Sequence, residues 1–199
     1  HVFVEKPLCL TEEELQDIRS TYEQQAAEGL HLMVGFNRRF SPHAKEARTF
    51  FSSRSNPLVM LYRINAGRIP ADHWVQDPDV GGGRVIGEVC HFVDYMHALC
   101  ASPPTSVFAS RVGRHSSGIT EDQCSLSLTF GDGSIGTIIY TAEGSSALQK
   151  EHFEAHADGM SLVMSDFMET RTYHNGKSAL FKTAKRDKGF AQEMAQFVQ

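Results

Sequence analysis

The sequence has no excess of positive charge: 19 Lys and Arg stand against 24 Asp and Glu, with a formal net charge of -5 at pH 7. A protein that binds a nucleic-acid duplex concentrates Lys and Arg on one surface to displace counterions, so this balance argues against a nucleic-acid partner. The nearest basic stretch contains Lys182, Lys185, Arg186 and Lys188, with Asp187 among them. We interpret that stretch as a solvated surface.

Cysteine is scarce and shows no pairing pattern. The four cysteines stand at positions 9, 90, 100 and 124, inside apolar stretches and without a CxxC pair. This spacing argues against a disulfide framework and a zinc knuckle, and it predicts buried, reduced thiols of a cytoplasmic protein. No apolar run in the sequence approaches the roughly 20 residues that a membrane-spanning helix needs, so we expect no membrane partner.

What the chain does have is an ordinary globular composition, with 41% hydrophobic and 22% charged residues over 199 positions. Such a chain can bury a substantial core. It opens in a strand-like run, His1 to Val4, and closes within a helical pattern that begins at Phe190. We therefore expect it to be part of a longer polypeptide.

Residues 1–40 predict one strand-helix-strand unit. Val2 to Val4 is a short, fully apolar run, which is typical of a strand covered on both faces. Thr11 and Glu14 form a capping-box pattern at the start of a helix, and His31 to Phe36 reads as a second buried strand. We interpret this unit as the last βαβ unit of a truncated, doubly wound parallel domain that binds a dinucleotide.

Residues 41–199 predict a second domain of the α+β class, for substrate binding and oligomerisation. Helices are expected at 42–52, where Ser41 and Pro42 provide a start signal, at 83–99, and from 189 onward. Turn signals joining strand-like runs occur at 131–133, 158–159 and 175–176. Successive hairpins indicate a broad, mainly antiparallel sheet with helices on one face.

Two short segments carry the most specific signal. Glu5-Lys6-Pro7 follows the first predicted strand, and the glycine triplet 81–83 opens a segment that contains His91 and Asp94. They resemble the Glu-Lys-Pro loop and the GGGxxxDxxxHxxD segment of the Gfo/Idh/MocA family of NAD(P)-dependent oxidoreductases. One position departs from the pattern, because Gly87 stands where the family has the aspartate.

The resemblance implies roles for several residues. It implies His91 as the proton acceptor and Lys6 as a catalytic cation near the nicotinamide ribose and the reacting hydroxyl. The Glu5-Lys6-Pro7 loop is then expected to contact the cofactor. It also implies a homo-oligomer through the free face of the sheet, and residues 134–140 fit this because they carry apolar side chains on both faces.

The residues themselves leave alternatives open. A single histidine on an apolar helix is more often structural, although positions 87, 91 and 95 share one face of a regular helix, so that His91 and Tyr95 project together. Glu88 and Asp94 are both candidates to replace the missing carboxylate. Glu88 points about 100° away from Gly87 on a regular helix and substitutes for it only if that turn is irregular. Asp94 is equally compatible with a surface or capping role.

Further polar and aromatic residues complete the predicted site. Arg38 follows the second predicted strand and shares the carboxyl edge of the parallel sheet with Lys6, so we expect it to contact the cofactor. Trp74, Glu88, Asp94 and Tyr95 are the candidate substrate-binding residues, with Trp74 as an aromatic plate for a sugar or cyclitol ring. No metal site is predicted, because three-residue steps spread the histidines and Asp94 around the helix.

The leading hypothesis is therefore the C-terminal part of an oxidoreductase. It transfers a hydride between a nicotinamide cofactor, NAD or NADP, and a secondary alcohol of a polyol, sugar or nucleotide sugar. The residues that hold the pyrophosphate and select the cofactor are expected upstream, so this part alone is expected to be inactive. The alternative is a ligand-binding or oligomerisation module without chemistry, and Gly87 favours it.

Overall fold

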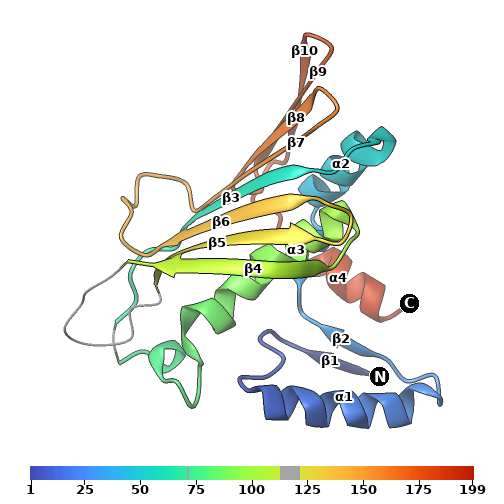
Figure 1. Ribbon diagram of the computed structural model, residues 1–199, viewed down its shortest axis with the longest axis vertical. Helices are drawn as coiled ribbons and strands as arrows, with labels where there is room; N and C mark the ends of the chain where they lie inside the picture. The colour runs from blue at the N-terminus through green and yellow to red at the C-terminus, as the bar shows by residue number, and fades with distance from the viewer. Residues whose placement is uncertain (71, 113–121) are drawn as a thin grey trace.

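A computed structural model describes residues 1–70, 72–112 and 122–199 and shows an α+β fold with two sheets (Figure 1). The small sheet has two strands, with one helix between them in the chain. The large sheet has eight strands with helices on one face. The predicted fold class is confirmed. Within the described residues, no helix has the length and apolar character needed to cross a membrane.

The first unit consists of β1 (Val2–Val4), α1 (Glu12–Ala26) and β2 (Leu32–Val34), and the two strands pair in parallel. The capping box is confirmed, since Thr11 accepts a hydrogen bond from the backbone of Glu14 and the Glu14 side chain accepts one from Thr11. A loop after β1 and a 3₁₀ turn after β2, Asn37–Phe40, lie at the carboxyl ends of both strands.

The large sheet has the strand order β10-β9-β8-β7-β3-β6-β5-β4. Every neighbouring pair is antiparallel except β3 and β6, which run in parallel at its centre. The predicted turns at 131–133, 158–159 and 175–176 join consecutive strands. The strands are β3 (Val59–Asn65), β4 (Pro104–Arg111), β5 (Gln123–Phe130), β6 (Ile135–Thr141), β7 (Glu151–Ala157), β8 (Met160–Ser165), β9 (Glu169–His174) and β10 (Lys177–Lys182).

Three helices accompany the large sheet: α2 (Pro42–Phe50) precedes β3, α3 (Cys90–Cys100) lies between β3 and β4 in the chain, and α4 (Phe190–Phe197) follows β10. The core forms where α2 and α3 pack on the sheet. Tyr62 of β3 contacts Phe92 and Tyr95 of α3, with ring centroids 4.8 and 5.5 Å apart. A further ring contact, between Phe3 of β1 and Phe197 of α4 at 5.5 Å, joins the small sheet to the C-terminal helix.

The helix predicted over 83–99 is present but is not regular. Its first part is a π-helical turn, Val85–Val89, and the α-helix begins at Cys90. A π turn adds about one residue to the α-helical repeat, so side chains before Cys90 point in other directions than a regular helix predicts. The structure thus meets the condition under which Glu88 can take the place of the missing aspartate.

Candidate functional site

A cavity of about 490 Å³ lies where the carboxyl ends of β1 and β2 meet the π turn and the start of α3. Its volume lies in the range that holds small ligands. The residues that line it are Glu5, Lys6, Asn37, Arg38, Ile69, His73, Val75, Arg84, Gly87, Glu88, His91, Lys188 and Phe190. The amine of Lys6 and the imidazole of His91, far apart in the sequence, thus share one cavity.

Lys6 is held at the cavity wall by the π turn. It follows β1 directly, and its Nζ donates a hydrogen bond of 2.8 Å to the backbone oxygen of Gly87. The Lys6–Pro7 peptide bond is cis. Pro7 itself lines a neighbouring surface depression with Leu8 and Val80, not this cavity.

His91 is 6% exposed and lies on the first turn of α3. Phe36 contacts it edge to face, with ring centroids 6.0 Å apart. Its Nδ1 is buried, and among the residues that the structure describes no hydrogen-bond partner reaches it. Burial, together with the positive charges of Arg38 and Lys6, lowers the pKa of His91 to about 3, so the ring is neutral near pH 7.

Glu88 is the carboxylate that the π turn brings to the cavity. Its Oε1 accepts a hydrogen bond of 2.7 Å from Lys150 Nζ, and its Oε2 accepts one from the Tyr140 hydroxyl and one of 3.2 Å from Arg84. Burial opposes its charge, but Lys150, Tyr140 and Arg84 outweigh it and lower the pKa of Glu88 to about 2. Glu88 is therefore a fixed, ionised acceptor.

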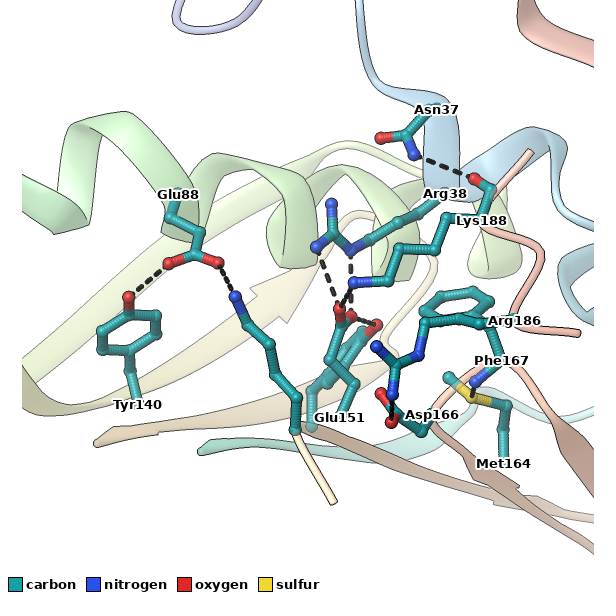
Figure 2. A network of polar contacts seen from close by, with 12 residues as sticks. Asn37, Arg38, Glu88, Tyr140, Glu151, Met164, Asp166, Phe167, Arg186 and Lys188 are labelled. Atoms are coloured by element: carbon teal, nitrogen blue, oxygen red, sulfur yellow. Dashed lines mark hydrogen bonds and ion pairs between the residues drawn. The ribbon is translucent and has the colours of Figure 1, made fainter. Parts of the chain in front are cut away.

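A fully buried carboxylate, Glu151, at the start of β7 bonds to two residues that line the cavity (Figure 2). Arg38 donates two hydrogen bonds of 2.9 Å to it, Tyr62 donates one of 2.7 Å, and Lys188 donates a further one. Burial works against both charges, yet the ion pair with Arg38 lowers the pKa of Glu151 and raises that of Arg38. The pair fixes two cations, Arg38 and Lys188, in the cavity wall.

Other residues predicted for the site lie elsewhere. Asp94 forms an ion pair with Arg39, including a hydrogen bond of 2.8 Å from Nε, and does not line the cavity. Tyr95 lies in the hydrophobic core against Phe153, at a centroid distance of 4.9 Å. Trp74 is 60% exposed, and the cavity is lined by its neighbours instead. We therefore do not assign Asp94, Tyr95 or Trp74 to the site.

The sequence did not reveal Glu151, Arg84 or Lys188. Glu151 begins a strand and Arg84 precedes the π turn, and neither belongs to the pattern that singled out the loop and the helix. The interpretation of the basic stretch as a solvated surface is wrong for Lys188, which is mostly buried and bonded to Glu151. The available signal was a glutamate in a strand-like run. If that strand is buried, the carboxylate requires a partner such as Arg38.

No group of three or more His, Cys, Asp or Glu suited to a metal ion occurs within residues 1–70, 72–112 and 122–199. The small sheet does fit one end of a dinucleotide. Glu5 and Lys6 follow β1, and Asn37 and Arg38 follow β2, so all four lie at the carboxyl edge where open parallel sheets bind such ligands.

Known proteins with this fold share both sequence and shape with the chain. The uncharacterized oxidoreductase YrbE of Bacillus subtilis is 27% identical over 142 residues, which cover 69% of this chain and 40% of YrbE. The structure of UDP-N-acetylglucosamine 3-dehydrogenase GnnA from Acidithiobacillus ferrooxidans matches with a TM-score of 0.78 at 18% identity, covering all of this chain and 60% of that one.

A third match is an inositol dehydrogenase homolog complexed with NAD⁺ from Azotobacter vinelandii, with a TM-score of 0.77 at 17% identity, covering 93% of this chain and 51% of that one. The chain thus spans 40% to 60% of the length of these relatives. The family model of the GFO/IDH/MocA C-terminal domain matches residues 57–162, more than half of the chain. The chain therefore belongs to the Gfo/Idh/MocA family.

Proposed function

We propose that this chain forms the substrate half of the active site of an NAD(P)-dependent dehydrogenase that oxidises a secondary alcohol of a polyol, sugar or nucleotide sugar. The observation that carries the proposal is the shared cavity of Lys6, Glu88 and His91. The names of the relatives, an inositol dehydrogenase homolog and a nucleotide-sugar dehydrogenase, support this class of substrate.

His91 accepts the proton of the substrate hydroxyl in this proposal. Its imidazole is neutral near pH 7, which is the form that takes a proton, although a pKa of about 3 makes it a weak base. A hydroxyl that begins to ionise beside Lys6 partly offsets the positive charge that His91 experiences, and this raises its basicity. The Lys6 ammonium stabilises the developing alkoxide.

Glu88 accepts hydrogen bonds from further hydroxyls of the substrate. A carboxylate has about four acceptor sites, so its contacts with Lys150, Tyr140 and Arg84 leave capacity for one more donor. When bound, the nicotinamide, as NAD or NADP, supplies the hydride acceptor. In this division of labour residues 1–40 contribute to cofactor binding through Glu5, Lys6 and Arg38, and residues 41–199 bind the substrate.

A second candidate function is a ligand-binding module that has kept the fold without the chemistry. Gly87 favours it, because the resembled pattern has a carboxylate at that position and a glycine cannot orient His91. The unpartnered Nδ1 of His91 also favours it. We further propose that copies of the chain associate through the open face of the large sheet, where Ile135 and Ile139 are exposed.

Turnover in the complete polypeptide that carries this chain distinguishes the two functions. The assay follows reduction of NAD⁺ and NADP⁺ with cyclitols, aldoses and nucleotide sugars. We expect His91→Ala to lower kcat by about a hundredfold or more. His97→Ala is the matched control, since His97 is on the same helix and does not line the cavity. Equal turnover in the His91→Ala variant and the control would rule out His91 as the base.

A further inference from the structure

A second cavity, of about 690 Å³, adjoins the first; we call it the outer cavity and the first the inner cavity. Its wall is formed by the end of β3, the segment between β6 and β7, and the loop that carries Arg186. Arg68 lines the outer cavity, and the next residue, Ile69, lines the inner one. The same stretch of chain therefore borders both cavities.

Two hydrogen bonds join residues that line the outer cavity to residues that line the inner cavity. Lys150 of the outer cavity donates its 2.7 Å hydrogen bond to Glu88 of the inner cavity. Arg84 of the inner cavity donates a hydrogen bond of 2.6 Å to the backbone oxygen of Gly67 in the outer one. A ligand held by Glu88 is thus one side chain away from the outer cavity.

The outer cavity is lined by more positively than negatively charged side chains. Three cations, Arg68, Lys150 and Arg186, line it with two carboxylates, Glu143 and Asp166. In the Arg186–Asp166 pair, the guanidinium side chain is 52% exposed and the carboxylate 10%. In the Lys150–Glu88 pair, the ammonium side chain is 34% exposed and the carboxylate 18%. In both pairs the cation is therefore the more accessible partner.

Arg186 and Lys150 each have further N–H donors that these ion pairs do not use. Asp166 engages Nη2 of Arg186, whereas a guanidinium carries five N–H donors, more than one carboxylate accepts. An ammonium has three donors, and Glu88 engages one of them on Lys150. Figure 2 shows Glu88 and Arg186 at opposite ends of one row of polar side chains, with Glu151 between them.

Hydrogen bonds fix the part of the outer cavity's wall that the segment after β6 forms. Asn65 Nδ2 donates hydrogen bonds of 2.7 Å to the Ser145 backbone oxygen and 3.1 Å to that of Leu148, which hold the segment after β6 in place. A Cβ at Gly144 would lie 2.2 Å from Asn65 Oδ1, so only a glycine permits this approach. These contacts fix the segment after β6 that lines the outer cavity.

We propose that the outer cavity binds an anionic extension of the substrate, a carboxylate or phosphate attached to the sugar or polyol whose alcohol enters the inner cavity. Arg186 and Lys150 contact the anion. This inference rests on the proposed function, because it takes the inner cavity as the place of the reacting alcohol. The planar guanidinium of Arg186 is suited to carboxylate and phosphate oxygens. Lys150 contacts Glu88, so an anion bound by Lys150 lies next to the part of the sugar or polyol that Glu88 binds.

Binding measured by calorimetry tests the inference without a cofactor or turnover. Three probes are titrated into the chain: glucose, glucuronate and UDP-glucose. We expect one or both charged probes to bind at least about fivefold more tightly than glucose, with a preference that weakens as salt is added. Arg186→Gln should abolish this preference and Arg186→Lys should restore part of it. Lys182→Gln, which removes an exposed cation of β10, is the matched control and should change nothing.

The probes also separate the two sources of the anion. Selectivity for glucuronate alone identifies a sugar carboxylate, and selectivity for UDP-glucose alone identifies a phosphate extension. Equal binding of all three probes, no binding of any, or a preference that survives Arg186→Gln overturns the inference. Charge-selective binding that Arg186→Gln abolishes, in a protein without turnover, would support the anion site and contradict the proposed dehydrogenase.

Discussion

Glu151 is 0% exposed, and it receives hydrogen bonds from three different parts of the chain. A buried carboxylate is costly unless it is paired and hydrogen-bonded, and here Arg38, Lys188 and Tyr62 satisfy it together. Arg38 also lies over the Phe92 ring at 5.1 Å, so its guanidinium is fixed on two sides. These contacts give the inner cavity a rigid positive wall beside His91.

The burial of His91 beside that positive wall leads to a prediction about pH. His91 has a pKa of about 3 in the folded protein and about 6.5 in the unfolded chain, so it is the unfolded state that binds a proton as the pH falls below about 6.5. Proton binding to the unfolded state alone lowers stability. We expect the free energy of unfolding to fall by about 2 kcal/mol more in the wild type than in His91→Gln between pH 7.5 and pH 5.

The measurement is urea unfolding of both proteins at several pH values. The comparison removes the contributions of the carboxylates and of His43, whose pKa is also lowered by burial, because both proteins share them. Parallel curves for the wild type and His91→Gln would contradict a depressed pKa of His91.

At the scale of single elements, the sequence predicted most helix starts and the turns between strands, because the residues that specify them are neighbours in the sequence. Asn175 and Gly176 have φ angles of 52° and 69°, the left-handed values that an Asn-Gly hairpin turn requires. The π turn at Val85–Val89 was not predicted, since a regular repeat of apolar residues does not reveal one inserted residue. Glu88 lies in this irregular turn and lines the inner cavity.

Gly189, just before α4, helps to place Lys188 at the inner cavity. Its φ is +90°, and a Cβ there would lie 2.5 Å from the Asn37 backbone oxygen. The chain therefore passes close against the 3₁₀ turn that follows β2, where Asn37 Nδ2 donates a hydrogen bond of 3.0 Å to the Lys188 backbone oxygen. A side chain at position 189 would displace the loop that holds Lys188 on Glu151.

We predict that Gly189→Ala destabilises the protein far more than Gly176→Ala. Both glycines have a positive φ, but a Cβ at Gly176 meets nothing within 4 Å. Gly176→Ala should cost about 1 kcal/mol from backbone strain, and Gly189→Ala at least about 2 kcal/mol more from the added clash. Urea unfolding measures both values, and equal losses would show that the approach at Gly189 is not tight.

At the scale of the whole molecule, the fold class was predictable because hairpin signals and amphipathic strands point to one architecture. The strand order was not. β3 pairs in parallel with β6 and antiparallel with β7, and such a choice depends on residues far apart in the sequence. The ion pair of Arg38 with Glu151 was missed for the same reason, since its partners lie 113 positions apart. That Lys6 and His91 share one cavity was predictable, because each lies in a recognisable local motif.

The open face of the large sheet is the remaining large-scale feature. On β6, Ile138 and Tyr140 are buried, whereas Ile139 is 42% exposed on the opposite face, and Val59 of β3 and Ile135 are exposed there as well. Apolar side chains at the centre of a sheet face that the described residues leave exposed favour association, and a symmetric pair of copies would cover them.

We therefore predict that the chain forms a dimer that Ile139→Lys disrupts. In a two-fold interface the substitution buries two like charges, so the dissociation constant should rise by about a hundredfold or more. Sedimentation velocity over a range of concentrations measures it. Leu15→Lys is the matched control, because Leu15 of α1 is also 42% exposed but lies outside the large sheet. A monomeric wild type, or a dimer that persists in Ile139→Lys, would place the association elsewhere, and loss of the dimer in Leu15→Lys would point to α1.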